Sequence, residues 1–248
     1  MQRLKCTISY DGTEFSGYQI QPNGRTVQGE IEHVLMRMHK GRQVRISASG
    51  RTDAGVHAVG QVIHFDTELD IPESGWIRAL NTQLPHDIQV FKVEKSGQEF
   101  HSRFATKKKE YRYRILNCLE RDLFRRNYVY HVPELLNIDA MKDAAQYILG
   151  EHDFTSFCAA GSSVKDKVRT VYELELIPKE DELIIRIVGN GFLYQMVRII
   201  VGNLLEVGRG KIEPGQIKEI LDARDRRKAL YTAPPQGLYL WHVDYANS

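Results

Sequence analysis

Residues 44 to 66 read VRISASGRTDAGVHAVGQVIHFD, and this stretch contains the pattern that decides the fold. Residues 44–49 are typical of a strand, and residues 61–66 alternate as a second strand would. The loop between them has Gly50 and Gly55 at its two ends, and glycine permits tight backbone turns. The stretch therefore predicts two strands joined by a compact loop that carries Arg51 and Asp53.

The sequence on either side completes a β-α-β-β-α-β order. Period-two alternation predicts a strand at residues 4–10, and helical spacing predicts a helix from residue 27, with Thr26 as its N-cap and Gly41 as its stop. A short helix around Trp76 and a strand at residues 88–93 follow. This is the order of a ferredoxin-like unit.

The second half of the chain repeats that order. Strands are predicted at residues 109–117, 128–131, 169–177, 183–188 and 237–245, and helices through residues 141–149, 192–207 and 217–221. The repeat predicts an α+β fold of two ferredoxin-like βαββαβ halves. We place residues 1–104 in the N-terminal half, with the glycine-flanked loop, and residues 105–248 in the C-terminal half.

Composition excludes several classes of protein. The 248 residues can bury a core, and their net charge is only +2. Three cysteines with no CxxC pair disfavour a disulfide scaffold and a zinc site, and the motifs of nucleotide-binding loops are absent. No apolar run approaches the ~18 residues of a membrane span. Since the chain also opens without an apolar signal region, we expect a cytoplasmic protein with no membrane association.

Positive charge is concentrated in two segments. Residues 103–126 contain nine basic and three acidic side chains, and residues 33–52 contain five basic side chains and no acid. Such segregation in a nearly neutral chain can build a field for phosphates, although a solvated face would give the same pattern.

Three side chains are candidates for chemistry. Asp53 could act as a nucleophile or base, with Arg51 favouring its ionised form, although Asp-x-Gly is also a common turn sequence. Tyr111 lies in a strand where basic and aromatic residues alternate, so it could stack on an unpaired base or simply face the core. Arg198 lies in a mostly apolar helix, where a surface charge is the simpler interpretation.

Seven segments of the chain, in order, resemble one family. The loop with its flanks, residues 49–58, closely resembles the active-site motif of the TruA-type tRNA pseudouridine synthases. Six further segments match that family: residues 10–19, 26–30, 81–88, 100–113, 192–202 and 237–245. One departure is Tyr18, where this family commonly has tryptophan.

The resemblance implies a fold and an activity. The fold would be two ferredoxin-like halves sharing an antiparallel sheet flanked by helices. The activity would convert uridine to pseudouridine at positions 38 to 40, in the anticodon stem-loop of tRNA. The family uses no cofactor and no metal, and it works as a homodimer with the tRNA lying across both subunits.

The resemblance also implies roles for individual residues. Asp53 would be the nucleophile, and Arg51 would steady the opening left by the flipped base and orient Asp53. Tyr111 would stack on the uracil and take part in removal of its C5 proton. Arg198 would pair with Asp53 or a phosphate, and Leu238 would pack under the base. Three routes stay open: attack of Asp53 on the sugar C1′, attack on uracil C6, or abstraction of a sugar proton to give a glycal.

Two other classes of function compete with this isomerase. A ferredoxin-like RNA-binding module would bind without catalysis, although no strand matches the aromatic signature of such modules. A metal-dependent hydrolase would use Asp53 and Asp66, and it would need a cluster of further ligands.

Overall fold

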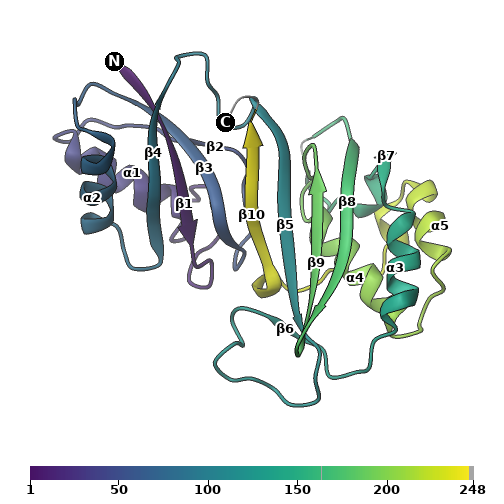
Figure 1. Ribbon diagram of the computed structural model, residues 1–248. Helices are drawn as coiled ribbons and strands as arrows, with labels where there is room; N and C mark the ends of the chain where they lie inside the picture. Colours follow the sequence, from purple (N-terminus) through teal and green to yellow (C-terminus); the bar gives the residue numbers. More distant parts are fainter. Residues whose placement is uncertain (163, 246–248) are drawn as a thin grey trace. The chain divides into compact units, whose positions relative to one another are not determined.

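The computed structural model describes residues 1–162 and 164–245 of the chain. The chain forms two compact units, which Figure 1 shows coloured along the sequence. Unit 1 comprises Met1–Lys107 and Tyr239–Ser248, and unit 2 comprises Lys108–Leu238. The first unit is therefore built from both ends of the chain, and the second from one continuous segment.

Unit 1 is a sheet with two helices. Its elements are β1 (Gln2–Tyr10), α1 (Val27–Met38), β2 (Ser47–Ala48), β3 (His57–Thr67), α2 (Glu73–Gln83), β4 (Ile88–Ser96) and β10 (Leu238–Tyr245). The strand order is β4-β1-β3-β10, and β2 pairs with β3. Burial alternates along β1, where Leu4, Cys6 and Ile8 are fully buried. This alternation is the pattern from which the strand was predicted.

The helix α1 begins as its sequence predicts. The hydroxyl of Thr26 accepts the backbone N–H of Gly29 at 3.2 Å, which satisfies one of the free amides of the first turn. Val27, Ile31 and Leu35 are buried on one face of the helix. An amphipathic helix capped by its own sequence thus closes one face of the unit.

The edge of β3 that faces away from β1 is shared by two strands. β10 runs parallel to β3 at its start, with Tyr239 opposite His57, and β2 runs antiparallel further along, with Ser47 opposite His64. We predicted residues 44–49 as a strand, but only two of them pair. The reason is local: the backbone N–H of Ile46 donates to Oε1 of Glu32 at 3.1 Å.

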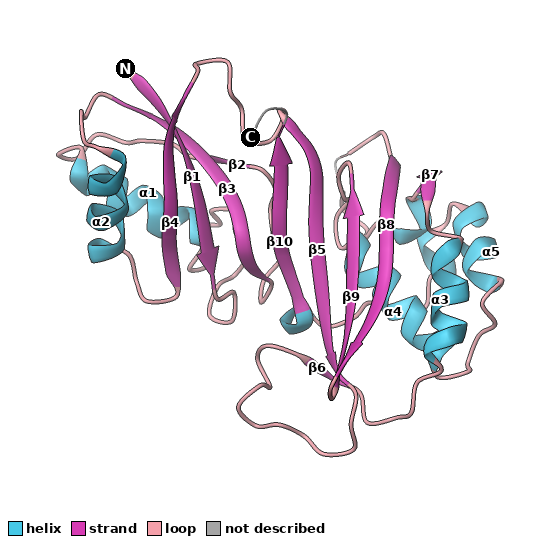
Figure 2. Ribbon diagram, viewed as in Figure 1, coloured by secondary structure: helices cyan, strands magenta, loops and turns pink. Residues whose placement is uncertain are grey.

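Unit 2 contains five strands and three α-helices within the described residues. Its elements are β5 (Thr106–Leu116), β6 (Tyr130–His131), α3 (Ile138–Gln146), β7 (Gly150–Asp153), β8 (Val168–Lys179), β9 (Glu182–Gly189), α4 (Met196–Gly208) and α5 (Gln216–Ala223), with 3₁₀ turns η1 (Thr155–Phe157), η2 (Arg226–Lys228) and η3 (Pro235–Gly237). The strand order is β5-β9-β8-β7, all antiparallel, and β6 adds to β5 in parallel (Figure 2). An α+β fold with mostly antiparallel sheet flanked by helices is thereby confirmed.

The two faces of β5 differ in character. Tyr111, Tyr113 and Ile115 are buried, whereas the alternate residues Arg112 and Arg114 are partly exposed. Both tyrosine side chains are buried in this structure, and a stacking role for Tyr111 stays a prediction.

Helix α4 begins later than its apolar pattern predicts. We expect a helix from about residue 192, but the observed helix starts at Met196. Gln195 has a left-handed backbone (φ 58°), which interrupts helical geometry just before that residue. None of the helices in the described part of the chain is long and apolar enough to cross a membrane.

Candidate active site

The loop that carries Asp53 is fixed to β3 at its entrance. The backbone N–H of Ser49 donates to the carbonyl of Val62 at 2.8 Å. The Ser49 hydroxyl donates to Oε1 of Gln61 at 2.6 Å, and Nε2 of Gln61 donates to the carbonyl of Gly50 at 2.7 Å. Gln61 is fully buried, so its side-chain amide holds Gly50, the first residue of the loop, in a fixed position.

Thr52 turns into the protein, while Asp53 stays partly exposed. The Thr52 hydroxyl is 2.8 Å from the Tyr10 hydroxyl, and its carbonyl accepts the N–H of Tyr18 at 3.0 Å. Burial raises the pKa of Tyr10 to about 12, so this phenol stays protonated at neutral pH. The N–H of Val56 donates to the Asp53 carbonyl at 3.2 Å and closes the turn. The loop thus holds a carboxylate at the surface on a fixed backbone.

Two glycines let the segment after β1 approach this loop closely. A Cβ on Gly12 would lie 2.1 Å from the carbonyl oxygen of Val56, which no side chain can occupy. Gly17 has a φ of +99°, and a Cβ there would lie 3.0 Å from the carbonyl oxygen of Thr52. Glycine is required at both positions because backbone packs directly on backbone.

His57 joins the same segment to the end of the loop. It is 2% exposed, and its Nδ1 accepts the backbone N–H of Gly12 at 3.0 Å. Oδ1 of Asp11 lies 3.2 Å from the same nitrogen. The imidazole stacks on the ring of Tyr239 in β10, with centroids 4.7 Å apart. From the sequence we could assign His57 no role. In the structure its contacts connect β3 to the segment after β1 and to β10.

Arg51 precedes Thr52 in the loop. Its side chain is exposed, and it forms no hydrogen bond or ion pair with any residue among 1–162 and 164–245. The sequence suggested that this guanidinium orients the carboxylate. That role of Arg51 stays a prediction, while the backbone contacts of Thr52, Gly50 and Val56 fix the loop.

The remaining predicted residues belong to unit 2. Tyr111 is 7% exposed, and its ring meets the edge of Phe192 at 5.2 Å with an interplanar angle of 84°. From the sequence alone we assign Phe192 no role, because an aromatic in an apolar run is typical of a core. Leu238, at the start of β10, is buried.

Arg198 is anchored in the first turn of α4. Its Nε donates to the Ala233 carbonyl at 2.8 Å, and the N–H of Ala233 donates back to the Arg198 carbonyl at 3.0 Å. The neighbouring Tyr113 hydroxyl donates to the Pro234 carbonyl at 2.8 Å. Arg198 is therefore a half-buried, positioned cation, not the loose surface charge that its apolar surroundings suggested.

The basic segment divides into paired and unpaired charges. Arg112 pairs with Glu110 at 2.6 Å, Arg114 with Glu182 at 2.7 Å, and Arg125 with Asp181 and Glu182. Five basic side chains of the segment are exposed and form no ion pair within the described residues: Arg103, Lys107, Lys108, Arg121 and Arg126. These five, rather than all nine, are the ones available to phosphates.

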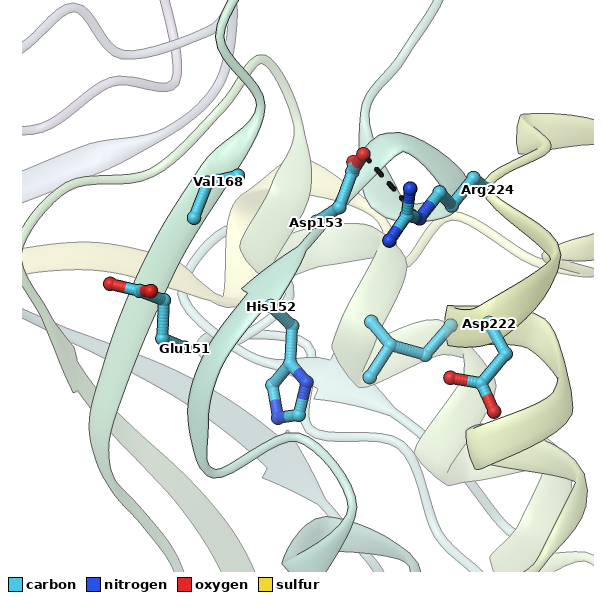
Figure 3. Close-up of a pocket in the computed structure, with 7 residues that line it drawn as sticks. Glu151, His152, Asp153, Val168, Asp222 and Arg224 are labelled. Atoms are coloured by element: carbon cyan, nitrogen blue, oxygen red, sulfur yellow. Dashed lines mark ion pairs between the residues drawn. The ribbon is translucent and has the colours of Figure 1, made fainter.

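A surface pocket of about 540 Å³ lies elsewhere in unit 2 (Figure 3). It is lined by Glu151, His152, Asp153, Val168, Leu221, Asp222 and Arg224. Nε of Arg224 is 3.6 Å from Oδ2 of Asp153, so the one guanidinium there faces a carboxylate. The pocket contains none of the predicted site residues, and its three carboxylates would repel a phosphate backbone.

The ligand cluster that a metal-dependent hydrolase needs is absent from the described residues. Asp66, its second predicted carboxylate, is held by Arg3 at 2.7 Å through two parallel hydrogen bonds. That guanidinium lowers the pKa of Asp66 and occupies both of its oxygens. The side-chain arrangement does not favour this alternative.

Comparison with known proteins identifies the family. The family model described as tRNA pseudouridine synthase matches residues 7–105 and 144–246, which include Asp53, Arg198 and Leu238. A tRNA pseudouridine synthase A of Bacillus cereus is 59% identical over 247 residues, and one of Anoxybacillus flavithermus is 58% identical over 247; each alignment covers 100% of both chains. One of Geobacillus kaustophilus is 58% identical over 244 residues, covering 98% of this chain and 95% of its own. The chain with the Asp53 loop therefore belongs to the tRNA pseudouridine synthase family.

Proposed function

We propose that this enzyme, an isomerase acting on uridine in tRNA, modifies positions 38 to 40 of the anticodon stem-loop with Asp53 as its nucleophile. The observation that carries the proposal is the loop geometry: Thr52 is locked inward by Tyr10 and Tyr18, while Asp53, the next residue, stays accessible. A carboxylate fixed in this way needs little reorganisation before it reacts.

The reaction is an isomerisation, so the product contains the same atoms as the substrate. The N1–C1′ bond breaks, the uracil rotates, and a C5–C1′ bond forms while C5 loses its proton and N1 gains one. No electron is gained or lost overall, so no redox partner is required. Asp53 supplies an electron pair at C1′ or at C6, or removes a proton from the sugar.

Other residues would hold the base after it leaves the stem, at a cost of a few kcal/mol. Tyr111 stacks on the flipped uracil, and Phe192 fixes the angle of its ring. Arg198 supplies a positioned cation for a carboxylate or phosphate, and Leu238 packs under the base. Arg51, exposed and unpaired in the described chain, is available to enter the space that the base leaves.

The exposed basic side chains would bind the tRNA backbone. The strand β5, which carries Tyr111, also contains Lys107 and Lys108, and Arg103 lies just before it. The enzyme would act in the cytoplasm, as a homodimer, without a metal or cofactor.

The decisive experiment is tritium release from tRNA labelled at C5 of uridine. The wild-type enzyme releases tritium, and Asp53→Asn releases none while it still binds the tRNA. A tRNA with cytidine at positions 38 to 40 is the matched control, and it should release no tritium with either enzyme. Substantial turnover by Asp53→Asn would refute the nucleophile assignment.

The same assay separates catalysis from binding alone. A non-catalytic RNA-binding module would retain its whole function after Asp53→Asn. Tyr111→Phe keeps the ring for stacking but removes the hydroxyl, so turnover should fall while tRNA affinity stays constant. Unchanged turnover would mean that Tyr111 only stacks.

A further inference from the structure

The side chain of Phe104, in unit 1, lies mostly in solvent. It is 76% exposed, in the segment that joins β4 to β5 (Figure 1). The other phenylalanines in the described part of unit 1 are less exposed: Phe15 and Phe65 are buried, and Phe91 is 49% exposed. An apolar ring in this position gains free energy when a ligand covers it.

The backbone under Phe104 is fixed by hydrogen bonds. Its N–H donates to the His101 carbonyl at 3.1 Å. Ser102, between them, is fully buried: its hydroxyl donates to the Ser47 carbonyl in β2 at 2.8 Å, and its carbonyl accepts the Tyr245 hydroxyl of β10 at 2.7 Å. The turn that carries the exposed ring is therefore pre-ordered, so little conformational freedom is lost when a ligand covers it.

Other rings support Phe104 from the protein side. Its ring lies against the imidazole of His101, with centroids 4.3 Å apart and an angle of 34° between the planes. His101 in turn contacts the buried imidazole of His64, with centroids 4.7 Å apart. An exposed aromatic ring held in this way is a platform on which a planar group can stack.

The charges beside this ring are positive. Cζ of Arg103 lies 5.8 Å from the centroid of the Phe104 ring, within range of a cation–π interaction. Arg103 and Lys107 are exposed, and neither forms an ion pair with another described residue. Residues 100–109 contain no acidic side chain. A partner that combines a planar apolar face with an anionic group fits this surface, and a nucleotide has both.

We propose that Phe104 and Arg103 bind one unpaired nucleotide of the substrate tRNA, with its base stacked on the phenyl ring and its phosphate paired with the guanidinium. Every base has a face that an aromatic ring can cover, so the contact requires an unpaired base but no particular sequence. The inference rests on the tRNA substrate of the proposed function. The stacked base is not the uracil that is modified, because the proposed partner of that uracil is Tyr111.

The affinity of variants for an unmodified tRNA transcript tests the contact. Phe104→Ala should weaken binding by about tenfold. Phe104→Leu keeps a large apolar side chain without a ring and should weaken binding to a similar extent, whereas Phe104→Tyr should bind as tightly as the wild type. Phe91→Ala is the matched control with wild-type affinity, because Phe91 is exposed in the same unit but its neighbour Lys92 pairs with Glu94 at 2.9 Å.

The salt dependence of binding separates the ring from the cation beside it. Phe104→Ala should leave the slope of log K against log salt concentration unchanged, because a phenyl ring releases no counterion. Arg103→Gln should reduce that slope by about 1. A reduced slope for Phe104→Ala would show that the variant loses a phosphate contact rather than a stacked base.

A second measurement detects the stacked base directly. Phe104→Trp adds an exposed indole to a chain that has only two tryptophans, and tRNA binding should quench its fluorescence. An abasic site is then introduced at each unpaired position of the tRNA in turn. At one position it should abolish the quenching, and it should weaken binding to the wild type but not to Phe104→Ala.

The results that would overturn the stacking contact differ from one another. Wild-type affinity of Phe104→Ala would show that the ring does not contact tRNA, and wild-type affinity of Phe104→Leu would show an apolar contact without stacking. Weaker binding together with an altered sedimentation coefficient would show that the ring packs against protein. Circular dichroism should show every variant folded, and tritium release by the wild type and by Asp53→Asn still decides the proposed function independently.

Discussion

The backbone N–H of Gly12 donates to Nδ1 of His57 at 3.0 Å, and this hydrogen bond joins the turn after β1 to the first residue of β3. The bond lies four residues from Asp53, beyond the turn that Val56 closes. It therefore couples the position of the loop to a single buried histidine.

His57→Phe should keep the ring against Tyr239 but leave the Gly12 amide without an acceptor. We expect the free energy of unfolding to fall by about 1–3 kcal/mol, with a lower kcat at nearly unchanged KM. His57→Asn is the matched variant, since it loses the ring but retains an acceptor near the Nδ1 position, and it should keep more activity than His57→Phe. Urea denaturation and steady-state kinetics measure both effects; equal activity in the two variants would mean that the hydrogen bond does not position the loop.

Two neighbouring tyrosines should respond in opposite directions to loss of their hydroxyls. The Tyr10 hydroxyl bonds to Thr52, whereas the Tyr18 hydroxyl is buried and finds no hydrogen-bond partner among the described residues. Tyr10→Phe should lower the free energy of unfolding by about 1 kcal/mol, and Tyr18→Phe should raise it by a similar amount. Thermal unfolding of both variants measures this, and destabilisation by Tyr18→Phe would contradict the unpartnered hydroxyl.

Stability should fall in mild acid because of His64. Burial, together with the charges of His101 and Arg3, lowers the pKa of His64 to about 4 from an ordinary 6.5. Between pH 4 and pH 6.5, His64 is protonated in the unfolded chain but not in the folded chain. The free energy of unfolding is therefore undiminished above pH 6.5 and decreases as the pH falls towards 4. The loss is about 3 kcal/mol at most.

Urea denaturation between pH 7.5 and 4.5 measures this effect of His64. His64→Asn removes the titrating group and keeps an acceptor for the N–H of Ser102, which lies 3.2 Å from His64 Nδ1. The variant should lose less stability than the wild type over the same interval. Parallel curves would assign the acid sensitivity to other groups.

The salt dependence of tRNA binding should distinguish the unpaired basic residues from the paired ones. Lys107→Gln and Arg103→Gln should each reduce the slope of log K against log salt concentration by about 1, since each cation that contacts a phosphate releases about one counterion. Arg114→Gln is the control, because Arg114 is bound by Glu182. Filter binding at several salt concentrations gives the slopes, and an equal reduction in the control would mean that the ion pair opens on binding.

Much of the fold could be predicted because its elements are regular and locally encoded. The alternation of Leu4, Cys6 and Ile8 and the cap at Thr26 both appear in the structure as the sequence indicates. β7 was not predicted, because its four residues are too short to show a period. The boundary at residue 104 placed the last strand, β10, in the C-terminal half, but β10 pairs with β3, which lies some 180 residues earlier in the chain. No local sequence pattern indicates a pairing partner at such a distance.

The candidate site was predicted less completely. Asp53 was identified from its glycine-flanked loop and from the resemblance to the TruA-type family. Its role stays a prediction, as do the roles of the other site residues, Tyr111, Arg51, Arg198 and Leu238. The sequence did not identify Gln61 and His57 as the residues that hold the loop, because each acts through contacts with another segment of the chain. Likewise, the pairing of Arg114 depends on Glu182, which lies on a different strand.

The return of β10 to unit 1 has a consequence for synthesis on the ribosome. Residues 108–238 form one uninterrupted segment and can complete their sheet as soon as they emerge. Most of unit 1 is made first, yet the strand that lies beside His57 is β10, which is made after all of unit 2. Its sheet can therefore be completed only after β10 has been synthesised, and a chain that lacks β10 would leave that edge of β3 open to other strands.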